Sequence, residues 1–232
     1  MKNILQENPN SPVSARQKAS LDFVDVSKSI SGKVILDLGC GFGWFEKFCI
    51  DNNCEKVVGL DVVDTDFELV KKKLNSEKLE LVLGSANILN FPKNSFDTVT
   101  AWEVIEHIPF GTEKQMLTEI EKVLKPGGIL YLSTPFSHPV SNLLDPAWWF
   151  GHRHYKLGEL KKLCKSANLE VIEYVVYGKF GLVLDLLNFY FSKWVLRRKR
   201  LFTEYFEEIE KFSYSKKCIN GYVNIFVKIK KK

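Results

Sequence analysis

The 232-residue sequence lacks the features of an exported, disulfide-stabilised protein. Its five cysteines contain no C-x-x-C pair, and an odd number leaves one thiol over in any complete pairing. The first nine residues have no uninterrupted apolar run of the kind that a secretory signal needs. We therefore expect a reducing, cytoplasmic setting and no export.

Blocks of one charge sign are also scarce. The formal net charge is +5, from 33 basic and 28 acidic residues, and most basic residues alternate with acidic ones. Basic residues gather only at 197–200 and near the C-terminal end, at positions 228 and 230–232. This distribution argues against nucleic acid as the partner.

What the chain does have is an alternation of short apolar runs with helical patterns. Apolar periodicity predicts helices at 112–124 and 156–167. Because parallel strands need crossover connections, the alternation predicts a doubly wound α/β fold with a mostly parallel, seven-stranded, Rossmann-like sheet. The expected strands are 34–38, 56–60, 80–83, 96–101, 129–133, 169–177 and 222–229, the last of them at or near an edge.

Two segments fall outside this alternation. Residues 1–30 are polar, with a helix expected within 15–29, and are predicted to form a helical cover over the entrance of the site. The remainder, 31–232, is predicted to be one domain. Residues 178–215 are too long for a hairpin turn and are predicted to be a helical lid inserted before the last strand.

The start of that insertion is amphipathic. Residues 180–196 are largely apolar, with a narrow polar stripe at Asp185, Asn188 and Ser192, and the basic run 197–200 follows. Seventeen residues that include Asp185 are too few and too polar for a membrane span. For 180–200 this leaves open a lid, a homodimer contact or peripheral attachment to an anionic membrane.

The loop after the first predicted strand contains three glycines. Backbone at Gly39, Gly41 and Gly43 can approach a ligand closely because these residues have no side chain. A dinucleotide fingerprint, G-x-G-x-x-G, would place its third glycine at position 44, where the chain has Trp44. This spacing disfavours a nicotinamide oxidoreductase.

Two acids near that loop indicate the charge of its ligand. Asp37 would lie poorly beside a pyrophosphate but is favourable next to a cation. Asp61 ends the second predicted strand, where a carboxylate can accept hydrogen bonds from both ribose hydroxyls. The pair predicts a cationic ligand that contains adenosine.

Residues from about 33 to about 174 resemble the class I S-adenosylmethionine-dependent methyltransferases, of the type 11/23-like kind. The resemblance rests on four blocks: D-L-G-C-G-F-G at 37–43, G-S-A-N-I-L-N-F-P-K-N-S-F-D at 84–97, W-E-V-I-E-H-I at 102–108 and L-K-P-G-G at 124–128. The last is expected to be a turn before the fifth strand. The resemblance implies methyl transfer with S-adenosylmethionine as the cofactor.

The resemblance also implies a role for individual residues. The glycine loop would hold the methionine part of the cofactor, Asp61 the ribose, and Val62 would pack on adenine. Ser85 stands where the family has an acid and is a weaker acceptor for the adenine amino group. The implied cofactor-binding residues are Asp37, Gly39, Cys40, Gly41, Gly43, Asp61, Val62, Ser85, Ala86 and Glu103.

Two histidines are the catalytic candidates. If the acceptor is a hydroxyl, His107 is the first candidate for a base, or else it packs over the cofactor. His154 belongs to the aromatic segment 148–155, which we expect to line the acceptor pocket. Alternatively, Trp148 and Trp149 are core residues beneath the following helix.

A metal-dependent reaction is a second interpretation. Glu103, Glu106 and His107 are spaced i, i+3 and i+4, so on a helical turn they could share a face and, with His152 or His154, bind a divalent ion. This resembles O-methyltransferases of quinone biosynthesis and of small-RNA 3′ ends. The leading prediction is methylation of a small-molecule, lipid or glycan acceptor at oxygen; an inactive cofactor-binding module also stays open because of Ser85.

Overall fold

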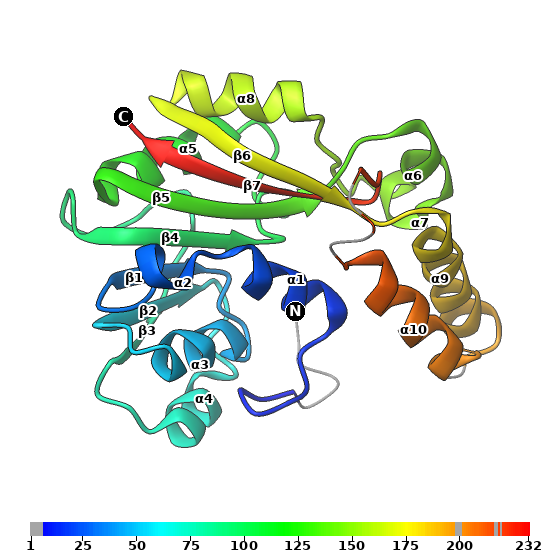
Figure 1. The fold of residues 1–232 in the computed structure, drawn as a ribbon, viewed down its shortest axis with the longest axis horizontal. Coiled ribbons are helices and arrows are strands. Elements are labelled where there is room, and N and C mark those ends of the chain that lie inside the picture. Colours follow the sequence, from blue (N-terminus) through cyan, green and yellow to red (C-terminus); the bar gives the residue numbers. More distant parts are fainter. Residues whose placement is uncertain (1–6, 198–200, 216–217, 219) are drawn as a thin grey trace.

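The protein forms one seven-stranded sheet with the order β3-β2-β1-β4-β5-β7-β6 (Figure 1). The computed structural model describes residues 7–197, 201–215, 218 and 220–232. Neighbours among β1 to β5 pair in parallel, and β7 runs antiparallel between β5 and β6. The predicted fold class and the near-edge place of the last strand are confirmed. The strands are β1 (Val34–Leu38), β2 (Lys56–Asp61), β3 (Leu79–Leu83), β4 (Phe96–Trp102), β5 (Leu124–Pro135), β6 (Leu169–Tyr177) and β7 (Asn224–Lys231).

Helices cover both faces of the sheet, and each face has its own core. On β1, Leu36 packs with residues of α5 and α8, whereas the adjacent Ile35 packs with residues of α1 and α3. The two sets separate because successive side chains of a strand point to opposite faces. The helices concerned are α1 (Ala15–Phe23), α2 (Val26–Ser29), α3 (Trp44–Asp51), α4 (Phe67–Leu74), α5 (Glu113–Val123) and α8 (Leu157–Ser166).

The fifth strand begins earlier than predicted. The segment 124–128, expected to be a turn, belongs to β5, and Leu124 pairs with Phe96 of β4. A register shift between Phe96 and Thr98 absorbs the irregular backbone, and Gly127 adopts a φ of +75° there. Proline and glycine therefore produce a bulged strand start instead of a separate turn.

Additional helices gather at the carboxyl ends of β4 and β5 (Figure 1). They are α6 (Pro139–Leu144) and α7 (Pro146–Trp149) after β5, then α9 (Phe180–Tyr190), a π-helical turn (Phe191–Val195) and α10 (Thr203–Ser213) between β6 and β7. The predicted helical insertion before the last strand is thus present. Residues 1–6 of the predicted cover and 198–200 of the predicted 180–200 segment lie outside the described residues.

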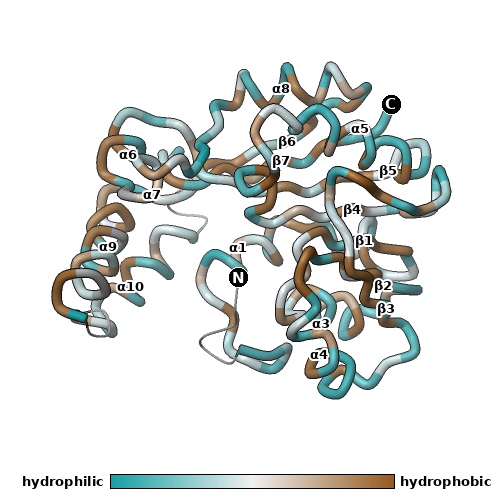
Figure 2. Tube along the Cα trace, turned by 180° about the vertical axis from the view of Figure 1, so that it is seen from behind, coloured by the Kyte–Doolittle hydropathy of each residue, from teal (hydrophilic) through white to brown (hydrophobic). Residues whose placement is uncertain are grey.

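Helix α9 is apolar along most of its length (Figure 2). Even so, none of the helices in the described ranges combines the length and the apolar character that crossing a bilayer requires. All five cysteines are free and buried.

Candidate functional site

The glycine loop joins β1 to α3 and needs glycine for two reasons. Gly39, Gly41 and Gly43 all have positive φ, which other residues adopt only at a cost. A Cβ on Gly39 would lie 2.7 Å from Val104 Cγ2, and one on Gly43 would lie 2.6 Å from Val70 Cγ1. The loop is therefore a tight backbone surface in which side chains at 39 and 43 do not fit.

Hydrogen bonds to the Asp61 carboxylate connect this loop to the end of β2. Its Oδ2 accepts a hydrogen bond of 3.0 Å from Gly41 N, and its Oδ1 accepts one of 3.0 Å from Val63 N. Each carboxylate oxygen keeps a further lone pair. The next residue, Val62, is 67% exposed, so an apolar surface stands beside the carboxylate.

Asp37 lies beneath the loop on β1 and is buried. Thr100 Oγ1 on β4 donates a hydrogen bond to Asp37 Oδ1. Burial raises the pKa of Asp37 to about 7, so the carboxyl is partly protonated near neutral pH. A cation placed nearby would favour its ionised form.

Ser85 and Ala86 follow β3 at the edge of the same surface. Ser85 Oγ accepts a 3.3 Å hydrogen bond from Asn87 N, and Ala86 is buried. The buried thiol of Cys40 lies within the loop itself. Apart from Glu103, which follows β4, the residues proposed to contact the cofactor lie in or directly after the carboxyl ends of β1, β2 and β3.

Glu103 follows β4 and adopts a left-handed conformation, with φ of +55°. Its carboxylate accepts hydrogen bonds from Ser133 Oγ (2.7 Å), Asn224 Nδ2 (3.0 Å) and Arg16 Nη1 (3.0 Å). Residues 103–107 form turns instead of the expected helical turn. Non-glycine residues hold this backbone conformation only where surrounding contacts enforce it, and such positions concentrate at functional sites.

Because that helical turn is absent, Glu103 is separated from the potential metal-binding cluster. One ligand atom each of Glu106, His107 and His152 lies within 4.8 Å of the others. Glu106 Oε1 and His152 Nδ1 are buried without a hydrogen-bond partner. Burial, with the charge of Glu103, raises the pKa of Glu106 well above its usual range, whereas burial lowers the pKa of both histidines.

Arg153 fixes the turn that carries this cluster. Its guanidinium donates to the carbonyls of Glu106 (3.1 Å), Ile105 (2.9 Å) and Ile108, and it pairs with Glu113 of α5. Four acceptors on one planar group leave little freedom to the turn. Nothing in the local sequence pattern indicated this role for Arg153.

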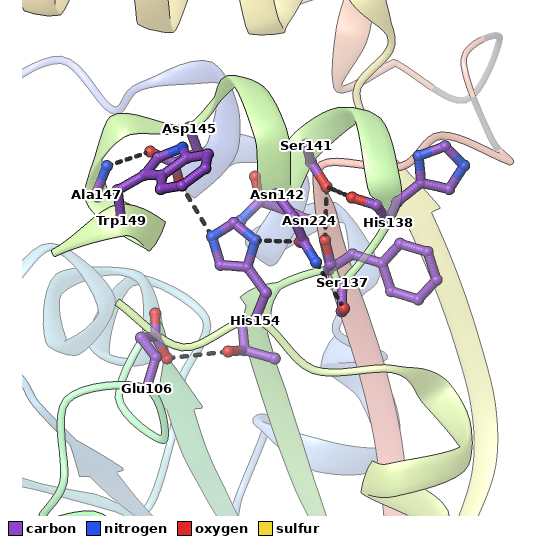
Figure 3. Close-up of polar contacts among 12 residues, drawn as sticks. Glu106, Ser137, His138, Ser141, Asn142, Asp145, Ala147, Trp149, His154 and Asn224 are labelled. Atoms are coloured by element: carbon purple, nitrogen blue, oxygen red, sulfur yellow. Dashed lines mark hydrogen bonds and ion pairs between the residues drawn. The ribbon is translucent and has the colours of Figure 1, made fainter. Parts of the chain in front are cut away.

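His154 is held on both ring nitrogens (Figure 3). Nδ1 lies 2.8 Å from Asn142 Oδ1, and Nε2 lies 3.0 Å from Asp145 Oδ2. The imidazole therefore holds α6 and α7 against residues 152–155, which lead into α8. To act as a base, His154 would first have to exchange one of these hydrogen bonds.

A cavity of about 370 Å³ opens between Glu103 and the additional helices. Its wall includes Asn224, His152 and His154 on the strand side and Leu182 and Tyr214 on the helix side. Trp148 and Trp149 are not among the residues that line the cavity. They are not core residues either, because their side chains are 39% and 63% exposed. Within the aromatic segment, the histidines thus line the cavity and the tryptophans face outward.

Comparison with known proteins identifies the family. A model described as a methyltransferase domain matches residues 36–132. The ubiquinone biosynthesis O-methyltransferase of Dechloromonas aromatica is 30% identical over 194 residues, which cover 72% of this chain and 79% of that protein. The chain belongs to the class I S-adenosylmethionine-dependent methyltransferases.

Two further similarities agree with this assignment. The demethylmenaquinone methyltransferase of Lactococcus lactis is 39% identical to this methyltransferase over 125 residues, which cover 51% of this chain and 48% of that protein. The structure of the 1,6-didemethyltoxoflavin-N1-methyltransferase of Burkholderia thailandensis, with S-adenosylhomocysteine bound, shares the fold. Its TM-score is 0.63 at 14% identity, with 94% of this chain and 78% of that chain covered.

S-adenosylmethionine is the cofactor of this methyltransferase, and the described residues fit it. The loop leaves no room for a Cβ at Gly39 or Gly43, the ribose hydroxyls match the open lone pairs of Asp61, and Val62 offers an exposed apolar side chain. Arg16 and Asn224, which sequence reasoning missed, and Arg153, which it included in the segment 148–155 without a role of its own, support the other side of the site.

Proposed function

We propose that this methyltransferase methylates a hydroxyl group of a small molecule bound in the cavity beyond Glu103. The supporting observation is the position of that cavity. It adjoins the carboxyl ends of β4 and β5, and its wall includes Glu103, whose neighbour Val104 lies against Gly39 of the glycine loop. The relatives named as O-methyltransferases of ubiquinone biosynthesis support oxygen as the methylated atom.

The proposed reaction is an in-line displacement. When bound, the cofactor supplies an electrophilic methyl group on a sulfonium. The chain contributes the alignment and the exclusion of water, with α1 as a cover and α9 and α10 as a lid. His107 lines the neighbouring pocket, and its ring centroid lies 5.1 Å from that of His152 in the cavity wall. Burial lowers the pKa of His107, so its neutral imidazole can accept the proton of an acceptor hydroxyl that reaches this boundary between the two pockets.

Substitutions distinguish the proposed roles of His107 and His154. His107→Gln is expected to lower kcat about 100-fold with little change in S-adenosylhomocysteine affinity, because only the base is removed. His154→Asn is expected to raise the KM for the acceptor, because α6 and α7 lose a support of the cavity. Phenolic and catecholic compounds provide the acceptor panel. Equal turnover in His107→Gln and the unchanged protein would refute the role of His107 as base.

A metal-dependent form of the same reaction is the second candidate. The favouring observation is the cluster of Glu106, His107 and His152, in which Glu106 Oε1 and His152 Nδ1 are buried without a hydrogen-bond partner. A carboxylate with two imidazoles suits Zn²⁺, Mn²⁺ or Fe²⁺ better than the all-oxygen sphere preferred by Mg²⁺. A divalent ion there would lower the pKa of an acceptor hydroxyl.

Chelation distinguishes these candidates. The metal-dependent form predicts loss of turnover with a chelator, restoration by Mn²⁺ or Zn²⁺, and Mn²⁺ binding in calorimetry that His152→Ala abolishes. His138→Ala is the matched control, since His138 instead accepts a hydrogen bond from Val140 N. Full activity in the presence of the chelator would refute the metal-dependent reaction and support the metal-free one.

We further propose that the insertion touches a membrane surface that carries anionic lipid, where a lipid acceptor would be available. Phe191 and Phe202 are 51% and 75% exposed, and Arg197 begins the basic run 197–200. Flotation with phosphatidylglycerol vesicles should retain the protein at low salt, and Phe191→Ser with Phe202→Ser should release it; Ile172→Ser on β6 is the control. If the protein does not bind the vesicles and light scattering shows a dimer, this surface is instead the contact of a homodimer.

A further inference from the structure

A second buried acid lies beside Asp37. Glu46, in the first turn of α3, is fully buried, and its carboxyl group is in contact with that of Asp37 on β1. Neither oxygen of Glu46 has a hydrogen-bond donor as long as both groups are ionised. Because an ionised carboxylate without a hydrogen-bond donor is strongly disfavoured in a buried environment, one of the two groups must hold a proton.

The sheet leaves space for this carboxyl. Position 59 of β2 is glycine, and a Cβ there would lie 2.6 Å from Glu46 Oε1. The same Cβ would lie 2.9 Å from Cys40 Cβ and from Leu81 Cδ2. Gly59 therefore provides the room that Glu46 occupies, and the tight surroundings fix the carboxyl against β1.

The groups around Glu46 do not neutralise it. Asp37 of β1 and Asp61 at the end of β2 act on it electrostatically, and the thiols of Cys40 and Cys49 belong to the same buried cluster. Burial, together with these acids, raises the pKa of Glu46 well above its usual range. The N-terminus of α3 favours an anion at this position, but only weakly.

We propose that Glu46 is a positioning residue for the cofactor site, which donates a hydrogen bond as a neutral carboxylic acid to the ionised Asp37. Asp37 then has two donors from opposite elements, Thr100 on β4 and Glu46 on α3. Together they hold its negative charge beneath the glycine loop. The inference rests on the proposed placement of the cationic methionine part of the cofactor over residues 39–43.

Two substitutions with side chains of similar length distinguish hydrogen-bond donation by residue 46 from simple occupation of the space beside Asp37. Glu46→Gln keeps a donor, whereas Glu46→Met keeps the volume and removes it. The affinity for S-adenosylmethionine, which carries the sulfonium cation, is expected within about threefold of the unchanged protein in Glu46→Gln and about tenfold weaker in Glu46→Met. Affinity should fall below pH 7 in the unchanged protein, as Asp37 takes up a proton, and this midpoint should move upward in Glu46→Met. The exposed Glu55→Gln is the control.

Each other outcome decides against the proposal. If Glu46→Met keeps the cofactor affinity and the pH profile of the unchanged protein, Glu46 only fills space. If both variants lose the same amount of cofactor affinity, the ionised form of Glu46 is required. If Glu46→Met fails to fold, infrared spectroscopy replaces it: the protonated carboxyl band of the unchanged protein should lose the intensity of one carboxyl in Glu46→Gln, while the contribution of Glu106 remains. Absence of S-adenosylhomocysteine binding by the unchanged protein would instead refute the cofactor placement.

Discussion

The cofactor side and the acceptor side of this site are built in different ways. The cofactor side comes mainly from one continuous segment, in which the backbone of the glycine loop and the carboxylate of Asp61 form the surface. The proposed acceptor side unites Arg16, Glu103 and Asn224 from distant parts of the chain through side-chain hydrogen bonds, and His152 lines the same cavity. In the proposed site, backbone geometry therefore holds the cofactor, and side chains select the acceptor.

The largest expected effect comes from adding a methyl group to the cofactor side. Gly39→Ala incurs the left-handed backbone penalty of about 1–2 kcal/mol and a contact with Val104 Cγ2 at 2.7 Å. We expect S-adenosylhomocysteine affinity in calorimetry to fall about 100-fold, or about 3 kcal/mol. Gly111→Ala has a similar φ of +81° with nothing within 4 Å of its Cβ, so it should bind normally. Equal losses in both would disprove the steric argument.

The second effect concerns pH and the buried Asp37. Its folded pKa of about 7 lies above the unfolded value of 3.8, so folding takes up a proton between these limits. Stability from this group is therefore lost as pH rises, by up to about 3 kcal/mol from pH 5 to 7. Denaturant unfolding of the ligand-free protein against Asp37→Asn should show this changing difference. A constant difference across the range would contradict the raised pKa.

A change on the acceptor side should leave the cofactor side intact. Arg153→Lys replaces a planar group that holds three carbonyls of the turn at 105–108, and lysine cannot reproduce this fork. We expect kcat to fall about tenfold and S-adenosylhomocysteine affinity to stay within about twofold. Parallel losses of both quantities would show that the two sides are not independent.

The smallest effect tests one bond of the same support. Tyr155 Oη lies 3.2 Å from Ile105 O and 3.2 Å from Glu113 Oε1, and these two acceptors share its one proton. Tyr155→Phe should reduce kcat/KM by about two- to fivefold, consistent with about 1 kcal/mol for a hydrogen bond. Steady-state kinetics provides the comparison with Arg153→Lys. A larger loss here than in Arg153→Lys would reverse the importance assigned to the two side chains.

Sequence patterns predicted the fold and the cofactor loop because both depend on local information. β1 and β6 begin and end where the apolar runs predicted, and the G-x-G-x-G spacing located the loop. Patterns failed where pairing decides the outcome, as at 124–128, which joins β5 through its contact with β4. The roles of Arg16, Arg153 and Asn224 were missed because their partners are distant in sequence. An acid among the apolar residues of α3 was the one available signal for Glu46.

The proposed placement of the cofactor on the glycine loop and Asp61 can be tested most directly by calorimetric titration of S-adenosylhomocysteine into the unchanged protein and into Asp61→Ala. We expect binding by the unchanged protein and a loss of affinity of at least about 100-fold in the variant, because a buried ribose loses its charged acceptor and the loop loses its hydrogen bond to the end of β2. Equal affinity of the two proteins would contradict the placement of the cofactor.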